Sequence, residues 1–167
     1  KILYGMYQSD EGEIWIKGQK VKLRSPKNAI QNGIGMVHQH FTLVPSLTVT
    51  QNIILGRPPK TKFGLIDIKG ATRKIADMSD KYNLKIDPDA LVKDLPVGVR
   101  QRVEILKALY LGANILILDE PTAILTPQEI SQLFKTLTSL KEKGKSIVLI
   151  THKLAEIIDV TDDITIM

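Results

Sequence analysis

The second half of the chain carries the clearest pattern of apolar and polar positions. Apolar residues recur at helical spacing over residues 99–111 and again over residues 130–140. Apolar runs at 115–118 and 146–150 flank the second of these segments, and both are predicted to be buried strands of a parallel sheet. A capping box with proline at the first helical position, Thr126-Pro-Gln-Glu129, marks the start of the helix between them. Strand, helix and strand form a βαβ unit, so the predicted fold class is α/β.

The beginning of the chain has a different pattern. Residues 1–5 are predicted to be the last turn of a helix, with Gly5 near its C-cap. Alternating apolar residues on either side of Gly18 predict an antiparallel hairpin. Residues 34–37 form a further short apolar strand.

Between these regions, residues 41–94 are less regular and are interrupted by prolines, with helical spacing near residues 70–83. We interpret this segment as a mostly helical insertion into a core made of residues 1–40 and 95–167. The whole is a parallel sheet flanked by helices, with a small antiparallel β part.

Composition narrows the class of protein. A length of 167 residues allows one domain. The absence of cysteine excludes disulfides and thiolate metal sites, and no apolar run is long enough to cross a bilayer. The net charge of +5 comes from basic residues scattered among acidic ones, with only three Phe, one Trp and four Tyr. A stacking and phosphate-binding surface for nucleic acid is therefore not predicted.

Polar side chains follow each predicted parallel strand. Gln39 follows the strand at 34–37, Asp119 and Glu120 follow the strand at 115–118, and His152 follows the last strand. Ligands of open parallel sheets bind outside the carboxyl ends of the strands. Taken singly, each of these groups is more often a solvated or structural strand end. Together, two carboxylates, an amide and an imidazole suit phosphoryl transfer to water, with a carboxylate holding Mg²⁺.

Four segments carry a family resemblance. Residues 114–122, Asn-Ile-Leu-Ile-Leu-Asp-Glu-Pro-Thr, resemble the Walker B segment of ATP-binding-cassette (ABC) ATPases. Residues 95–102, Leu-Pro-Val-Gly-Val-Arg-Gln-Arg, resemble their signature motif. Residues 37–41, Val-His-Gln-His-Phe, are similar to the Q-loop, and residues 150–152, Ile-Thr-His, to the switch-histidine segment. Their order and spacing match the family along essentially the whole chain, which implies a P-loop NTPase-like fold.

The resemblance implies a role for each residue at the strand ends, with ATP and Mg²⁺ as cofactors. Asp119 would hold Mg²⁺ through water, and Glu120 would be the general base for the hydrolytic water. Gln39 would touch Mg²⁺ and that water and would couple the site to a membrane partner. His152 would contact the γ-phosphate.

In the signature segment the implied nucleotide-binding residues are Pro96, Val97, Gly98 and Gln101. The amides at the start of the helix that follows form an anion site, which in the family grips the γ-phosphate held by the opposite subunit. The active site would therefore form only in a head-to-tail pair of ABC domains.

Two positions depart from the family pattern. Pro96 replaces the signature serine and offers neither a hydroxyl nor an N–H, while Thr126 replaces the aspartate usual after Walker B. Both substitutions resemble the first ABC domain of bacterial ATPases that carry two such domains and take up simple sugars and nucleosides. Residues 38–47 and 103–109 also resemble that subfamily.

The phosphate-binding loop G-x-x-x-x-G-K-[ST] does not occur in the 167 residues. Gly144-Lys-Ser146 is a near match, but Ser139 stands where the earlier glycine is required, and the segment leads into a strand. The true loop is expected upstream of Lys1, so the chain is interpreted as an N-terminally truncated domain that is inactive by itself.

The preferred hypothesis is a transport ATPase subunit at the cytoplasmic face of the cell membrane. Its partners would be transmembrane permease subunits, a second ABC domain and, indirectly, a substrate-binding protein, with no nucleic acid. One alternative is a non-transport ABC ATPase that acts on ribosomes, which would be expected to keep the signature serine. The other is a binding or scaffolding module without catalysis, which Pro96 and Thr126 favour and Glu120 and His152 oppose.

Overall fold

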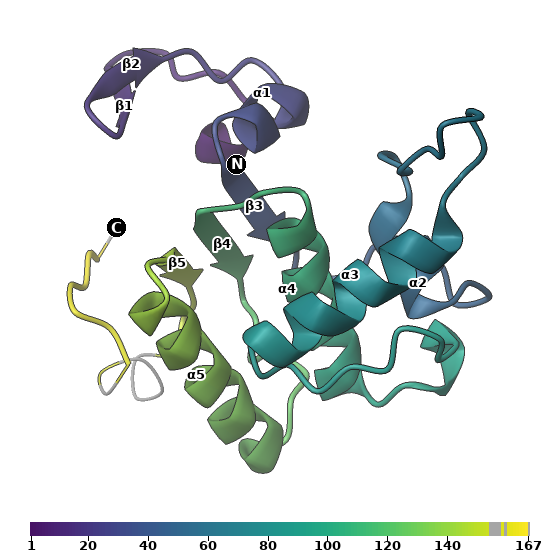
Figure 1. The fold of residues 1–167 in the computed structure, drawn as a ribbon. Helices are drawn as coiled ribbons and strands as arrows, with labels where there is room; N and C mark the ends of the chain where they lie inside the picture. The colour runs from purple at the N-terminus through teal and green to yellow at the C-terminus, as the bar shows by residue number, and fades with distance from the viewer. Residues whose placement is uncertain (154–157, 159, 167) are drawn as a thin grey trace.

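The computed structural model describes residues 1–153, 158 and 160–166. Helices and strands follow one another in an α/β order, and the N-terminus lies beside α1, near the β hairpin (Figure 1). In chain order the elements are η1 (Ile2–Tyr4), β1 (Ile14–Ile16), β2 (Gln19–Val21), α1 (Pro26–Gln31), β3 (Ile34–Val37), α2 (Val49–Ile54), α3 (Ile68–Lys81), η2 (Val92–Asp94), α4 (Val97–Tyr110), β4 (Ile115–Asp119), α5 (Pro127–Glu142) and β5 (Ser146–Ile150).

The central sheet has the strand order β3-β4-β5 and is parallel throughout. Its register aligns Val37 with Leu118 and Leu118 with Leu149, so the three strands end level with one another. The predicted strand at 146–150 and the predicted βαβ unit are both present. All three carboxyl ends therefore open onto one edge, toward which the arrowheads of β3 and β4 point in Figure 1.

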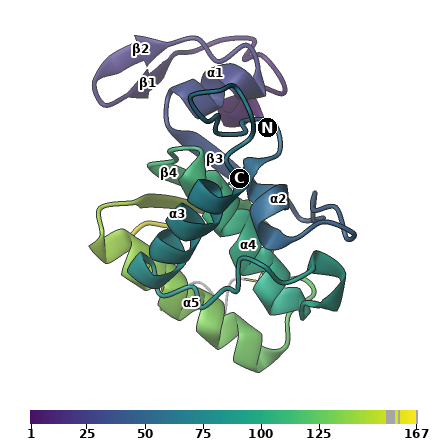
Figure 2. The ribbon, with the colours of Figure 1, turned by 45° about the vertical axis from the view of Figure 1, so that its right-hand side comes forward.

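Side chains alternate between two faces of the sheet, as period-two strands require. Val37, Leu116 and Leu118 belong to the larger hydrophobic cluster, together with residues of α2, α3, α4 and α5. Ile34 and Ile117 belong to a smaller cluster under the hairpin, α1 and the start of the chain. Figure 2 shows the hairpin and α1 together at one end of the molecule and α5 at the other.

Helix α4 lies unusually close to β3 because of a glycine. A Cβ atom at Gly35 would lie 2.8 Å from the Cβ of Ala108 and 2.9 Å from that of Ala113, closer than carbon atoms pack. Small residues on all three positions let the helix backbone approach the strand. This close packing fixes α4, which carries the signature segment, against the sheet that carries the candidate catalytic residues.

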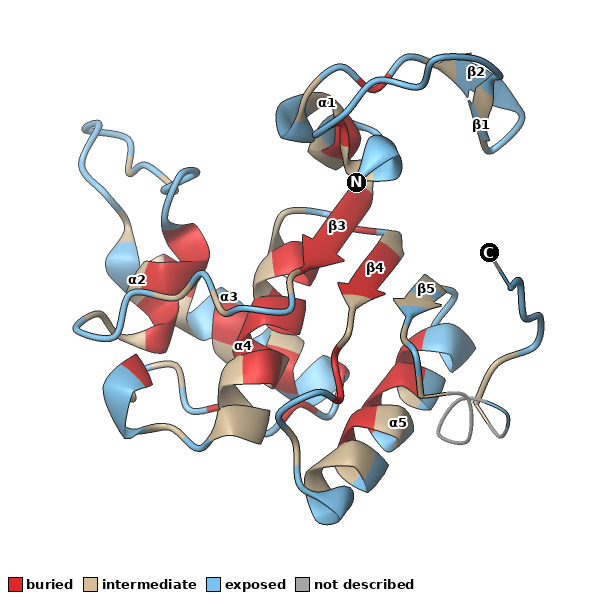
Figure 3. Ribbon diagram, turned by 180° about the vertical axis from the view of Figure 1, so that it is seen from behind, coloured by how far each residue is buried: buried red, intermediate tan, exposed pale blue. Residues whose placement is uncertain are grey.

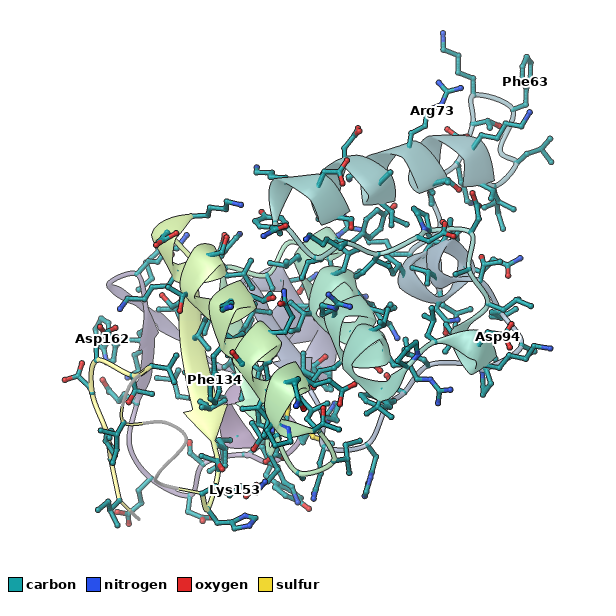
Figure 4. All side chains as sticks on the ribbon, turned by 90° about the horizontal axis from the view of Figure 1, so that it is seen from below. Phe63, Arg73, Asp94, Phe134, Lys153 and Asp162 are labelled. Carbon is teal, nitrogen blue, oxygen red and sulfur yellow. The ribbon has the colours of Figure 1, made fainter. Side chains whose placement is uncertain are left out.

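The segment between β3 and α4 folds as two helices and a 3-10 turn that pack on α4. Asn52, which is 1% exposed, organises the loop before α2. Its Oδ1 accepts a hydrogen bond from the N–H of Val44 at 2.7 Å, and its Nδ2 donates to the carbonyls of Val44 and Thr48 at 3.0 Å each. In the loop between α2 and α3, Phe63 is 92% exposed and lies away from the strand ends (Figure 4).

The capping predictions agree with the structure. The Thr126 hydroxyl accepts a hydrogen bond from the Glu129 N–H, and the Glu129 carboxylate accepts one from the Thr126 N–H, which completes the capping box of α5. Gly112 and Gly144 follow the ends of α4 and α5 with positive φ values of 95° and 75°. Those conformations favour glycine, so they account for both helix ends.

Two sequence predictions were wrong in detail. Residues Ile2–Tyr4 form a 3-10 turn rather than α-helix, although Gly5 does cap it in the left-handed conformation. The strand at 146–150 is not buried: its exposure alternates, and Val148 and Ile150 are 38% and 37% exposed. Figure 3 shows β3 buried along its length and β5 without a buried residue. The reason is position, because within the described residues β5 pairs only with β4.

Candidate functional site

The carboxyl edge of the sheet gathers most of the predicted site residues. The pairing ends at Val37 with Leu118 and at Asp119 with Ile150, so the residues that follow each strand leave the sheet at the same edge. Figure 4 views the molecule from the side of this edge, with Lys153 at the end of β5 labelled. The predicted residues that border the edge are Gln39, Asp119, Glu120 and His152.

Glu120 and His152 are in direct contact. The Nδ1 atom of His152 lies 2.8 Å from Oε1 of Glu120, a hydrogen-bonding distance. The two side chains differ in access to water, since that of Glu120 is 19% exposed and that of His152 is 74% exposed. The imidazole therefore orients the carboxylate while remaining open to a ligand. Spacing in the sequence predicted a shared edge, and the structure adds the bond itself.

The backbone of Glu120 is held in an uncommon conformation. Its φ is +49°, in the left-handed region that residues other than glycine rarely adopt. The N–H of Glu120 donates to the carbonyl of Ile150 at 2.8 Å, which ties the conformation to the end of β5. Such strain is concentrated at functional sites, where the surrounding structure holds it.

Two buried oxygen atoms at this edge have no hydrogen-bond partner among the described residues. They are Oε2 of Glu120 and the hydroxyl oxygen of Thr122. A buried polar atom without a partner is costly, on the order of 1–3 kcal/mol. These atoms therefore have hydrogen-bonding capacity at the edge that no described residue uses.

Gln39, after β3, and Asp119, at the end of the central strand β4, are the other two predicted residues at the edge. Gln39 is exposed in the bend that follows β3, and Asp119 is half-buried as the last residue of β4. Among the described residues, no three or more His, Cys, Asp and Glu side chains are grouped to hold a metal ion by themselves. A carboxylate that binds a hydrated ion does not require such a group.

Helix α4 is bonded to the loop behind Glu120. Gln101 is 3% exposed, and its Nε2 donates to the carbonyl of Pro121 at 2.7 Å. The sequence predicted Gln101 as a nucleotide-binding residue, but the structure turns its side chain inward, onto the Walker B loop.

The start of α4 holds the other three predicted nucleotide-binding residues. Pro96 is the N-cap and makes no side-chain hydrogen bond to the helix, as expected for a residue without a hydroxyl. Val97 and Gly98 form the first helical turn. The Gly98 N–H does not point to an open anion site, because it donates to Oε1 of Glu129 at 3.0 Å.

Sequence reasoning missed two carboxylates at this site. Glu104 is 6% exposed, and its Oε1 accepts hydrogen bonds from the N–H of Thr42 at 2.7 Å and from its hydroxyl at 2.9 Å. It thereby bonds α4 to the loop after Gln39. Glu129 was recognised only as part of a capping box. An acidic residue on the apolar face of a predicted helix was the available signal for Glu104, whereas nothing local indicated the contact between Glu129 and Gly98.

No helix among the described residues combines the length and apolar character needed to cross a membrane.

Comparison with known proteins agrees with the geometry. The family model described as "ABC transporter" matches residues 1–123. The chain is 54% identical over 166 residues to the nucleoside import ATP-binding protein NupA of Lactococcus lactis subsp. cremoris, covering 99% of this chain and 33% of that protein. It is also 54% identical to the guanosine import ATP-binding protein NupO of Bacillus subtilis, covering 99% of this chain and 32% of the relative. The chain thus spans about a third of the length of the curated relatives it matches.

Solved structures share the fold. An ATP-binding cassette of an ABC transporter, crystallised in its ADP conformation, superposes with a TM-score of 0.81 at 22% identity, covering 96% of this chain and 67% of that one. An α/β core with a parallel sheet and a small antiparallel sheet is common to both the prediction and the structure. With the family model matching most of its length, the chain belongs to the ABC transporter family of ATP-binding cassettes.

Proposed function

We propose that the protein to which this chain belongs hydrolyses ATP and couples the reaction to the import of a simple sugar or a nucleoside. The observation that carries the proposal is the hydrogen bond between Glu120 and His152, directly beside Asp119 at the carboxyl edge of the sheet. The names of similar proteins, which include nucleoside, guanosine and glucose import ATP-binding proteins, support import as the process that is driven.

In this proposal Glu120 is the general base. Its Oε1 is held by His152, and its unpartnered Oε2 accepts a hydrogen bond from the attacking water and then the proton of that water. The exposed imidazole of His152 reaches the γ-phosphate from the other side. The left-handed backbone at Glu120 keeps its carboxylate at the strand end, where a substrate meets it.

Asp119 and Gln39 are proposed to hold a hydrated Mg²⁺ ion, which neutralises phosphate charge when bound. The residues present fit that ion, because it binds through one or two carboxylates and keeps several of its waters. Gln39 also lies in the loop that Glu104 ties to α4, a suitable place to respond to a membrane partner.

The wider assembly follows from the same proposal. A second ABC domain would complete the nucleotide site, transmembrane permease subunits would carry the solute, and a substrate-binding protein would deliver it. The chain would lie at the cytoplasmic face of the cell membrane and bind no nucleic acid. Residues 1–40 and 95–167 would perform the chemistry, and residues 41–94 would form an inserted helical unit.

The test uses the intact protein with its permease subunits in lipid vesicles. ATP hydrolysis should rise when the transported nucleoside or sugar is present, and Glu120→Gln should lower turnover by about a hundredfold or more while ATP still binds. Glu142→Gln, an exposed carboxylate at the end of α5, is the matched control and should behave as wild type. If the Glu120→Gln protein keeps more than about a tenth of the turnover, under about 1.4 kcal/mol of barrier, the base lies elsewhere.

A further inference from the structure

One carboxylate joins the beginnings of two helices. Oε2 of Glu129 accepts hydrogen bonds from the N–H and the hydroxyl of Thr126, both at 3.0 Å, as part of the capping box of α5. Its Oε1 accepts the Gly98 N–H in the first turn of α4, also at 3.0 Å. Glu129 therefore caps its own helix and a helix that begins 31 residues earlier.

Helix α4 lacks the cap that its own sequence would normally supply. The first N–H groups of a helix have no partner within the helix and are usually satisfied by a side chain at the N-cap. Pro96 occupies that position and makes no such bond. The carboxylate of Glu129 takes over the task at Gly98, and its negative charge lies at the positive end of the helix dipole.

The contact also accounts for glycine at position 98. A Cβ atom there would lie 2.8 Å from Oε1, 3.0 Å from Cγ and 3.1 Å from Cδ of Glu129. The side chain of Glu129 thus fills the space that the missing Cβ leaves. The hydrogen bonds from the Thr126 and Gly98 N–H groups, in that order, are the main causes that lower the pKa of the Glu129 carboxyl.

We propose that Glu129 is a positioning residue that fixes the signature segment to α5 and occupies the Gly98 amide, so that this amide does not bind a nucleotide phosphate. The proposal rests on the proposed function, since it concerns the nucleotide site that α4 completes. A phosphate that approaches the start of α4 meets a carboxylate, and like charges repel. The site that includes this signature segment consequently binds ATP more weakly than an open helix N-terminus would.

The experiment separates the charge of Glu129 from its shape in the intact protein. Glu129→Gln keeps the capping box, which accepts Glu or Gln, and removes both the charge and the second oxygen that accepts the Gly98 N–H. Titration calorimetry with a slowly hydrolysed ATP analogue should show binding about two- to fivefold tighter at the site that includes α4, the range expected for one charge at a helix terminus. Glu142→Gln makes the same charge change at the other end of α5 and should leave binding unchanged.

A second measurement tests the bond itself without nucleotide. Hydrogen exchange of residues 95–103 should be slow in the wild type and faster in both Glu129→Gln and Glu129→Ala, because in each variant the Gly98 amide loses its acceptor. Glu142→Ala should leave this exchange unchanged. The proposal is overturned if Glu129→Ala exchanges like wild type, or if Glu129→Gln binds the analogue no more tightly than Glu142→Gln.

The two proposals fail in different ways. A wild-type protein that neither binds the analogue nor hydrolyses ATP contradicts the proposed function, and the exchange measurement still decides whether Glu129 holds α4. A wild-type protein that hydrolyses ATP, with Glu129 variants indistinguishable from the controls, contradicts only the role of Glu129.

Discussion

The carboxyl edge of the sheet and the start of helix α4 differ in how their polar groups are satisfied. At the edge, Oε2 of Glu120 and the hydroxyl of Thr122 are buried without a partner among the described residues. At the start of α4, the half-buried N–H of Gly98 is bonded, and both oxygens of Glu129 are used. The unpartnered oxygens at the edge have hydrogen-bonding capacity left for a ligand, whereas the bonded groups at the start of α4 connect this helix to α5. The resemblance to the family predicts a phosphate contact at both places, and at the start of α4 the Gly98 amide is already bonded within the chain.

The strongest test of this difference compares the two nucleotide sites of the intact protein. Glu120 belongs to the edge that remains open, and it would act on ATP gripped by the signature of the second ABC domain. Glu120→Gln should therefore lower transport by about a hundredfold or more. The corresponding change in the second domain should have a smaller effect, provided that the signature of that domain retains its serine.

Single-turnover hydrolysis with each glutamate replaced in turn measures the difference. Equal losses from the two substitutions would mean that both sites work alike and that the altered signature around Pro96 has no functional consequence.

The sequence predicted the residues at the carboxyl edge of the sheet better than the contact between Gly98 and Glu129, for a physical reason. The position of Glu120 follows from the apolar run at 115–118, which is a local pattern, and from the rule that ligands bind at the carboxyl ends of parallel strands. The bond to Gly98 depends on how α4 and α5 pack, and Glu129 is 31 residues away. The exposure of β5 was likewise mispredicted, because an apolar run does not reveal how many neighbours its strand has.

A second prediction concerns the packing of Gly98 against Glu129. Gly98→Ala places a methyl group 2.8 Å from Oε1 of Glu129, so the carboxylate must move or the helix must shift. Because Oε1 is the far end of a flexible side chain, the carboxylate moves away and the main cost is the lost Gly98 hydrogen bond, about 0.5–1.5 kcal/mol. The melting temperature of the intact protein should fall, and hydrogen exchange at residues 95–103 should become faster.

The double variant Gly98→Ala/Glu129→Ala is the control for this packing. Removing the carboxylate removes the obstacle, so the two substitutions together should cost less than the sum of the single effects, as expected for residues in contact. Strict additivity would show that Gly98 and Glu129 do not constrain one another in solution.

The smallest expected effect is that of restoring the signature serine. Pro96→Ser adds a hydroxyl at the N-cap of α4, and a hydrogen bond to a charged group is worth about 1.5–3 kcal/mol when it forms. Here the neighbouring amide of Gly98 is already occupied by a carboxylate, which repels the phosphate that the hydroxyl would bind. Serine also gives up the φ of −57° that proline fixes at the start of the helix. We therefore expect Pro96→Ser alone to tighten binding of an ATP analogue by less than about threefold, equivalent to about 0.6 kcal/mol.

In the Glu129→Gln background the same substitution should have a larger effect, because the charge that opposes the phosphate is gone. Analogue titration of the two single variants and the double variant measures this coupling, and a full gain from Pro96→Ser in the wild-type background would show that proline, not the carboxylate, closes the start of α4.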